Sequence, residues 1–206
     1  AYLRMAEQTF AGMTDQEANT SLCARIALIR ANNAQNDGNL PETVRYAEQV
    51  LRLAPKGDAF LRSQAAITLG FTQWTAGNVS ASLRAMRAWM DDMNHLGNQL
   101  FMIASAFAVA DMLVIMGHLG EAGEALLQTI EQADAHGNEA EVVTAHHHLG
   151  LAMLAHERGD DAAFAQSWQA AERLGQRTTL VDWAYRWNLA QARLRASESQ
   201  WDAALN

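Results

Sequence analysis

Two interleaved series of glycines, each with a step of about forty residues, constrain the fold of this chain more than any other feature. The first series has intervals of 39, 40 and 42 residues and consists of Gly38, Gly77, Gly117 and Gly159. The second series lies half a period away, has intervals of 40, 40 and 38 residues, and consists of Gly57, Gly97, Gly137 and Gly175. A glycine just past a helix end takes the left-handed conformation without a side-chain clash. The glycines therefore predict a helix, a turn, a helix and a turn in every period, which is the signature of a helical solenoid.

Composition supports an all-α protein, because the stretches between the glycines are rich in good helix formers and the chain has only two prolines. The first helix of each pair is expected near 18–36, 58–76, 98–116, 139–158 and 179–197. The second helix is expected near 40–54, 79–95, 119–135 and 160–174, after N-terminal caps at Asn39, Asn78, His118 and Asp160. Short turns make paired helices antiparallel, and stacked pairs are expected to wind into a right-handed superhelix with a concave inner surface.

All 206 residues are expected to form one helical-repeat domain. It would consist of a partial repeat at 1–16, repeats near 18–56, 58–96, 98–136 and 139–175, and a truncated repeat at 179–206. Solenoids need polar capping repeats, whereas this sequence opens and closes inside a repeat, so we expect a fragment of a longer protein.

Cysteine usage and hydropathy indicate a cytoplasmic setting. The single cysteine, Cys23, cannot form an internal disulfide, and the start of the chain does not resemble a signal peptide. The longest apolar run, 100–116, is interrupted by Ser105 and Asp111 and is shorter than a membrane span requires. No membrane role is expected.

Charge is distributed unevenly, because no Lys or Arg lies between Arg87 and Arg158 in a chain of net charge −8. This acidic segment would repel phosphate backbones, which argues against direct binding of nucleic acid. The same segment holds all seven histidines, but three consecutive histidines at 146–148 point in different directions on a helix and cannot converge on one metal ion. No catalytic or nucleotide-binding motif is present. Neither an enzyme nor a metal or cofactor in this part of the protein is expected.

The period resembles tetratricopeptide repeats, whose motif reads W-x2-L-G-x2-Y, then A-x3-F and then P. Leu69-Gly70 and Leu149-Gly150 match the central dipeptide, and Pro55 stands where the terminal proline belongs. The Trp and Tyr positions of the motif are lost, and the period is longer than the usual length of about 34 residues. These departures indicate a subfamily.

Five longer segments are similar to the MalT-like sensor domain of large ATP-dependent LuxR-type transcription regulators. They are Ala24–Ala31, Gly38–Leu40, Ala47–Leu51, Ala65–Gly70 and His118–Ala122. The resemblance runs from about residue 21 to residue 204. It implies a superhelical domain that binds an inducer and governs self-association, between an upstream nucleotide-binding module and a downstream helix-turn-helix. Binding of ATP and DNA would then belong to parts that this sequence lacks.

The concave surface is the expected place of a binding site, with one stripe of each first helix facing the groove. The candidate ligand-binding residues on these stripes are Arg25, Asn32, Gln64, Phe71, Trp74, Phe107, Asp111, Thr144, His147 and Arg186. Aromatic side chains with a few separated polar groups are typical of a ligand site. Asp111 is the strongest single candidate, because a lone carboxylate in an apolar helix is unfavourable unless it faces water or a partner. Ordinary packing between helices is the alternative for Phe71 and Phe107.

The sequence therefore favours a domain that binds a small inducer or a protein segment in its groove. The alternative is a free-standing tetratricopeptide scaffold that binds peptides of partner proteins, although Lys56 is the only lysine and a lysine-based carboxylate clamp is disfavoured. Trp183 and Trp187 lie one turn apart and are expected to leave an exposed apolar patch at the C-terminal edge. Such patches drive association, so weak self-association is expected there.

Overall fold

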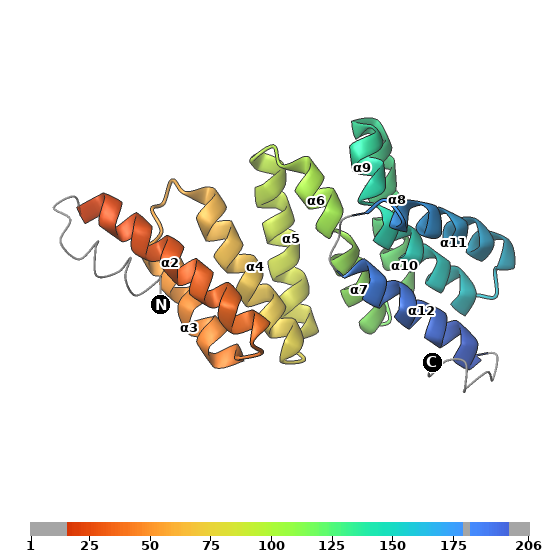
Figure 1. Cartoon of the computed structure of the whole chain (residues 1–206), viewed down its shortest axis with the longest axis horizontal. Coiled ribbons are helices and arrows are strands. Elements are labelled where there is room, and N and C mark those ends of the chain that lie inside the picture. Colours follow the sequence, from red (N-terminus) through yellow and green to blue (C-terminus); the bar gives the residue numbers. More distant parts are fainter. Residues whose placement is uncertain (1–15, 179–181, 198–206) are drawn as a thin grey trace. The chain divides into compact units, whose positions relative to one another are not determined.

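A computed structural model describes residues 16–178 and 182–197, and the regular structure of these residues is α-helical (Figure 1). The contacts between residues divide the chain into two compact units, one up to Asn98 and one from Gln99 onward. The prediction of an all-α protein built from consecutive helix pairs is confirmed. The arrangement of the repeats as one domain stays a prediction.

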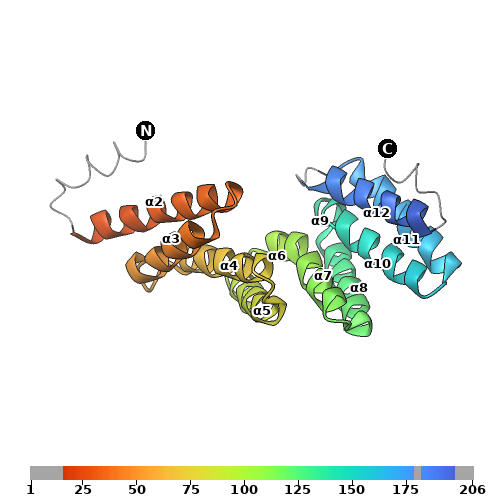
Figure 2. The ribbon, with the colours of Figure 1, turned by 90° about the horizontal axis from the view of Figure 1, so that it is seen from below.

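The described residues of the first unit, 16–98, form two helix pairs. Helices α2 (Gln16–Asn36) and α3 (Leu40–Leu53) form one pair, and α4 (Ala59–Thr75) and α5 (Val79–His95) form the other. Helix α3 also packs on α4, so the pairs are stacked (Figure 2). These helices begin and end within two residues of the predicted positions.

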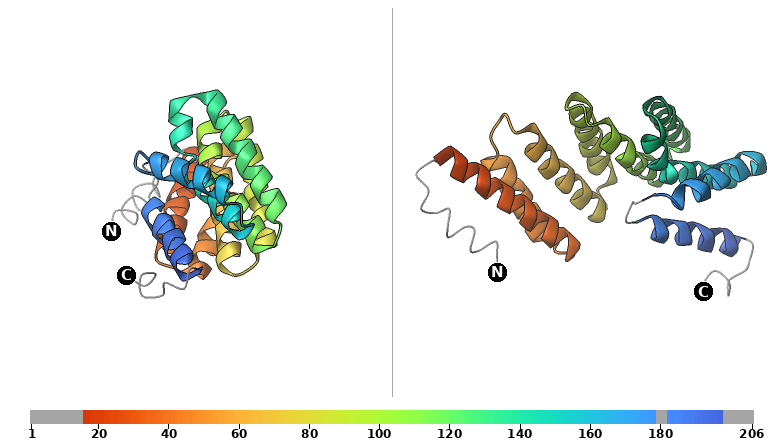
Figure 3. Two further views of the ribbon diagram at one scale, coloured as in Figure 1. Left: turned by 90° about the vertical axis from the view of Figure 1, so that its right-hand side faces the viewer. Right: turned by 45° about the horizontal axis from the view of Figure 1, so that its top comes forward.

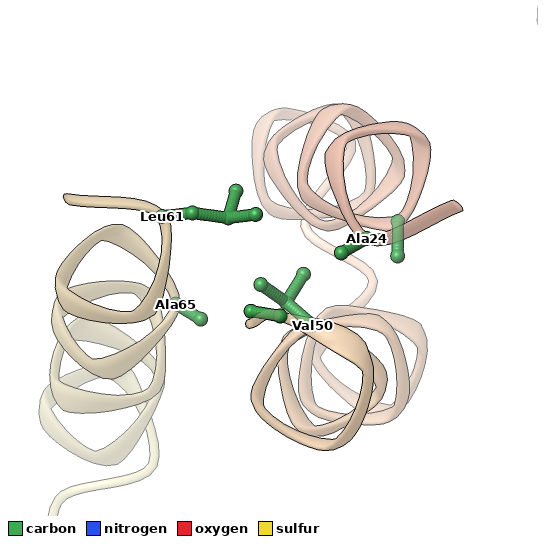
Figure 4. Packing of buried hydrophobic residues seen from close by; sticks show 6 residues of the cluster. Ala24, Val50, Leu61 and Ala65 are labelled. Carbon is green, nitrogen blue, oxygen red and sulfur yellow. The ribbon is translucent and has the colours of Figure 1, made fainter. Parts of the chain in front are cut away.

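The core of the first unit is made largely of small residues. Ala24 of α2, Val50 of α3, and Leu61 and Ala65 of α4 lie against one another and are at most 3% exposed (Figure 4). Small side chains let helix backbones approach closely, and the burial of these apolar groups stabilises the stack. Gly70 of α4 serves the same purpose, because a Cβ atom added to it would lie 3.0 Å from the Cβ of Ala85 on α5.

The helices described in the second unit range from 5 to 18 residues in length. They are α6 (Gln99–Ser105), α7 (Phe107–Ile115), α8 (Leu119–His136), α9 (Asn138–Val142), α10 (Ala145–Glu157), α11 (Asp161–Gly175) and α12 (Trp183–Ser197). Helix α7 pairs with α8, and α10 packs on both α8 and α11. Helix α12 packs on α10 and α11 through Ala190 (Figure 3). The predicted start of the last helix, 179–181, lies outside the described residues.

The continuous helices predicted at 98–116 and 139–158 are wrong, because each is interrupted. The chain leaves the α-helix at Ala106 between α6 and α7, and at Val143 and Thr144 between α9 and α10. At each break the backbone N–H bonds the carbonyl three residues earlier, which is the tighter 3₁₀ pattern: Ala106 to Ile103 and Thr144 to Glu141. The Thr144 hydroxyl also donates to that Glu141 carbonyl at 2.7 Å, so the side chain competes with the helical ladder.

Most of the turn glycines behave as predicted. Positive φ values of 69° to 87° are found at Gly38, Gly77, Gly97, Gly117, Gly137 and Gly159. The prediction is wrong for Gly57 and Gly175, which lack a positive φ. Gly57 lies in a turn that begins with extended backbone at Ala54 and continues through Pro55, and Gly175 is the last residue of α11. A glycine is present at 175 because the Trp183 ring leaves no room there for a side chain.

The helix caps are partly as predicted. Asn39 and Asp160 accept hydrogen bonds from the backbone N–H three residues on, at 3.3 and 3.0 Å. Asn78 and His118 occupy the predicted N-cap positions, but neither side chain accepts a bond from the helix backbone. Asp58, which the sequence analysis did not single out, caps α4 at 3.0 Å. Each side-chain cap satisfies one backbone donor that the first turn of a helix leaves unpaired.

Candidate functional site

Polar and aromatic side chains from three helices meet in the second unit and form what we call the α7–α10–α12 cluster. It consists of Phe107 and Asp111 of α7, His146 and His147 of α10, Asp182 just before α12, and Trp183 and Arg186 of α12. The helix breaks position this cluster. Phe107 is the first residue of α7, and the two histidines lie in the first turn of α10.

Asp111 and Arg186 form a two-point ion pair within the cluster. Nη1 of Arg186 donates to Oδ2 of Asp111 at 2.6 Å, and Nη2 donates to Oδ1 at 3.1 Å. The Asp111 side chain is 28% exposed and that of Arg186 is 22% exposed, so the pair lies at the edge of the interior. The guanidinium also lies over the ring of Phe107, 4.5 Å from its centre. The carboxylate that the sequence expected to need water or a partner is thus paired with an arginine.

His146 links the cluster to the start of α12. Its side chain is fully buried, and its Nε2 lies 3.1 Å from Oδ1 of Asp182. The ring also lies 4.5 Å from that of Phe107 and 5.5 Å from that of Trp183. Burial lowers the pKa of His146, although the Asp182 carboxylate partly opposes this. The ring is therefore neutral near pH 7 and its Nε2–H donates to Asp182.

His147 is buried without a hydrogen bond of good geometry. Its side chain has no exposed surface, and neither ring nitrogen makes a hydrogen bond of acceptable geometry. Burial lowers the pKa of His147 to about 3, helped by the neighbouring His146, His148 and Arg186, although the backbone of Ile103 partly opposes the shift. The ring meets that of Phe107 edge-on at 6.2 Å and is neutral at physiological pH.

Several buried polar atoms of the cluster have no hydrogen-bond partner among the described residues. They are Nδ1 of His146, Nδ1 and Nε2 of His147, and Nε of Arg186. Leaving a buried polar group unpaired costs roughly 1–3 kcal/mol. A group of such atoms around one aromatic ring therefore favours a functional explanation over a purely structural one.

A stack of tryptophans holds α12 against α11. Trp187 lies 4.3 Å from Trp168 of α11 and 5.5 Å from Trp183, and these rings pack on buried Leu149 and Ala171. The prediction that Trp183 and Trp187 form an exposed patch is wrong, because both are half-buried in this stack. The large apolar side chains that α12 does expose are Tyr185, at 70%, and Leu189, at 38%.

Gly175 permits this stack to form. A Cβ atom added at Gly175 would lie 1.9 Å from the indole ring of Trp183. We expect Gly175→Ala to displace that ring and to lower the free energy of unfolding by about 1–3 kcal/mol, the usual effect of overpacking. Urea unfolding followed by tryptophan fluorescence measures the change. Gly120→Ala on α8 is the control, since no atom lies within 4 Å of its added Cβ. Equal effects of the two substitutions would contradict the expectation.

The other candidates do not join the cluster. Thr144 is buried, and its hydroxyl bonds the Glu141 carbonyl, so it shapes the break before α10. In the first unit, Arg25 pairs with Asp58 at 3.3 Å, Asn32 is exposed, and Nε2 of Gln64 is buried without a partner. Phe71 and Trp74 are half-buried and stack on each other with ring centres 6.3 Å apart. That these residues line one groove with the cluster stays a prediction.

Sequence reasoning missed His146, Asp182 and Trp183. His146 occupies the place of the first aromatic residue of the tetratricopeptide motif, a core position, and this placement was the signal that could have identified it. Asp182 immediately precedes the first turn of α12, where a carboxylate is favoured by the helix dipole. Trp183 lies three residues before Arg186, so the stripe spacing could have included it, but the sequence assigned it to an exposed patch instead.

An open depression of about 600 Å³ lies elsewhere on the second unit. Its lining comes from α11 and the residue after it: Gln166, Gln169, Ala170, Glu172, Arg173 and Gln176. None of the predicted ligand-binding residues contributes to it. Its polar lining and its construction from one helix make it a weaker candidate than the cluster.

No three His, Cys, Asp or Glu side chains within 16–178 and 182–197 come together as a metal site would require. In the same part of the chain, no helix combines the length and the apolar character needed to cross a membrane.

Comparison with known proteins gives one match. The family described as the MalT-like TPR region matches residues 24–206, which is most of the chain and extends over parts of both units. No curated protein and no solved structure matches the chain.

Proposed function

Because the chain belongs to the MalT-like tetratricopeptide-repeat family, we propose that it is the effector-sensing and protein-interaction domain of a bacterial LuxR-type transcription regulator. Its groove binds a small ligand or a partner segment, and binding controls self-association. The domain acts in the cytoplasm, carries out no catalysis and holds no cofactor. ATP and DNA binding belong to other modules of the regulator.

The observation that carries this proposal is the α7–α10–α12 cluster. Phe107, Asp111, His147 and Arg186 were singled out as groove residues from the sequence, and they come from three different helices that meet. The cluster combines an aromatic ring with buried polar atoms that have no partner. Such a combination is typical of ligand sites, where a few polar groups fix the orientation of the ligand.

Helix α12 offers a route from ligand binding to self-association. It is held by the Asp182–His146 contact and by Arg186, so a ligand at the cluster touches the groups that dock it. Its outer surface exposes Tyr185 and Leu189. We place the self-association surface there, since exposed apolar side chains favour association.

The test is a search for an effector on the 206-residue chain. A panel of sugars, amino acids and organic acids is screened for compounds that raise the unfolding temperature, and each hit is titrated by tryptophan fluorescence. We expect Phe107→Leu to weaken binding of the effector about tenfold, because the leucine loses the ring that faces Arg186 and the two histidines. Sedimentation velocity with and without the hit measures the linked change in association.

Phe60→Leu is the matched control, since Phe60 lies in the first unit and is 52% exposed. It is expected to leave effector affinity unchanged. Equal loss of affinity in both variants, or no loss in Phe107→Leu, would place the binding site outside the cluster.

The alternative is a free-standing tetratricopeptide scaffold that binds peptides of partner proteins. The repeat family itself supports this alternative, because domains of this type mediate protein interactions. In that case the panel gives no hit, and the parent gene encodes neither a nucleotide-binding module before the repeats nor a helix-turn-helix after them.

A further inference from the structure

We propose that the α7–α10–α12 cluster binds the carboxylate of a small organic acid at Arg186, in exchange for Asp111. The inference rests on the proposed function, because it names the ligand class of the same site. Asp111 meets the guanidinium through two parallel N–H···O bonds of 2.6 and 3.1 Å. Arginine binds free carboxylates with this same forked geometry, so Asp111 occupies the place that a ligand carboxylate would take.

Arg186 stays in position when Asp111 leaves. Its guanidinium lies on the Phe107 ring at 4.5 Å, a contact that does not involve the carboxylate. The helix that carries it is docked independently by the Asp182–His146 contact and by the packing of Trp187 on Trp168. The arginine is therefore held in place for an anion before any ligand arrives, which reduces the entropy lost on binding.

The Asp111 carboxylate can leave the Arg186 guanidinium without being buried unpaired. Its side chain is 28% exposed, so the displaced carboxylate turns toward water and is solvated. A fully buried carboxylate would have no such alternative and would remain paired. The exchange keeps one anion on Arg186 throughout, so no guanidinium is left unpaired in the half-buried site.

The polar atoms without partners make a ligand a better occupant than Asp111. A carboxylate that meets the two terminal nitrogens of Arg186 leaves the buried Nε unpaired, so that atom needs a further acceptor group, which Asp111 lacks. His146 uses Nε2–H on Asp182, so its unpaired Nδ1 is an acceptor, and the neutral ring of His147 has one donor and one acceptor. An organic acid that also carries a hydroxyl group offers both a donor and an acceptor to these atoms.

The small exposed fraction of the ion pair favours a small molecule over a protein segment. Both members of the ion pair are largely covered, with 22% and 28% of their side chains exposed. A peptide backbone needs a longer open surface than such a partly covered pair provides.

The experiment uses L-lactate as the probe and lactamide, its neutral amide, as the matched ligand control. Titrations are followed by the tryptophan fluorescence of the 206-residue chain, in which Trp183 belongs to the cluster. Because Asp111 competes as a tethered group at an effective concentration of millimolar or more, wild-type affinity for lactate is expected to be weak. We expect Asp111→Asn to bind lactate at least tenfold more tightly than wild type, and lactamide to bind neither protein.

Two further variants separate ligand exchange from a loss of structure. Asp111→Asn combined with Arg186→Gln is expected to abolish the gain in affinity, and circular dichroism with the unfolding temperature shows whether each variant is folded. If Asp111→Asn is unstable, the unfolding temperature of wild type with lactate against lactamide replaces the titration, and only lactate is expected to raise it. Unchanged or weaker lactate binding in folded Asp111→Asn, or equal binding of lactamide, overturns the exchange.

The outcome also distinguishes this inference from the proposed function. If a neutral compound of the effector panel binds in a way that depends on Phe107 while lactate does not bind Asp111→Asn, the ligand class is wrong and the sensing function stands. If neither lactate nor any compound of the panel binds, both fail.

Discussion

Trp89→Ala is expected to lower the free energy of unfolding of the first unit by about 3–5 kcal/mol, the usual cost of emptying a buried aromatic site. Trp89 lies on α5, is only 2% exposed, and is the largest fully buried side chain of the described residues. Met86 and Met93, about one helical turn before and after Trp89 on the same helix, are also buried, with 1% and 0% of their surface exposed. Methionines are flexible but cannot fill the volume of an indole, so a cavity remains.

Urea unfolding followed by circular dichroism at 222 nm measures the effect of Trp89→Ala. Phe60→Ala on α4 is the control, because its ring is 52% exposed and most of its contacts are with water. It is expected to change stability by no more than about 0.5–1 kcal/mol. If the two substitutions destabilise the protein equally, the burial of Trp89 is not what holds the first unit together.

His147→Leu is expected to remove a pH-dependent loss of stability of about 2 kcal/mol between pH 7 and pH 5. The pKa of His147 is about 3 in the folded protein and has its usual value of 6.5 when the chain unfolds. As the pH falls below 6.5, the unfolded chain takes up a proton that the folded protein refuses. The contribution of the neutral His147 ring to stability is therefore fully present above pH 6.5 and is lost progressively toward pH 3.

At pH 7 the same substitution is expected to leave stability unchanged or to raise it by roughly 1 kcal/mol, because leucine fills the site without two unpaired nitrogens. Urea unfolding at pH 7, 6 and 5 gives both values. His118→Gln is the control, since its side chain is 46% exposed and it should keep most of the pH dependence of the wild type. A His147→Leu variant with the pH dependence of the wild type would contradict the assigned burial.

A stable His147→Leu variant would also bear on function. If His147→Leu has a higher free energy of unfolding than wild type, His147 does not serve to stabilise the packing. The comparison then shows that the unpaired ring nitrogens lower the stability of the wild type. Loss of effector binding in the same variant would show that the nitrogens that lower stability are needed for ligand recognition.

Local sequence signals predict some helix bounds but not the interruptions within helices. The bounds of α5, Val79–His95, agree with the predicted 79–95, because the turn glycines on either side of it, Gly77 and Gly97, are local signals. The interruptions at Ala106 and at Val143–Thr144 escaped prediction. A helix-forming composition runs through both, and only the backbone bonds of the folded chain reveal the tighter turns.

In the α7–α10–α12 cluster, by contrast, the contacts depend on residues that are distant in the sequence. Asp111 was identified from sequence because a carboxylate in an apolar helix needs a partner, but that partner, Arg186, lies 75 residues away. Trp183 and Trp187 were correctly placed on one helical face, yet the direction of that face depended on Trp168 and Gly175 of α11. Periodicity places residues on a face and does not identify what the face meets.

The sequence by itself determined the all-α class, the alternation of helices and turns, most of the turn glycines, and the family, since each depends on interactions within about four residues or on a repeated pattern. The tertiary structure alone decided the two helix breaks, the pairing of Asp111 with Arg186, the inward packing of the tryptophans, and the burial that lowers the pKa of His147 to about 3. Burial and pairing are properties of the environment that distant helices create, and no local pattern encodes that environment.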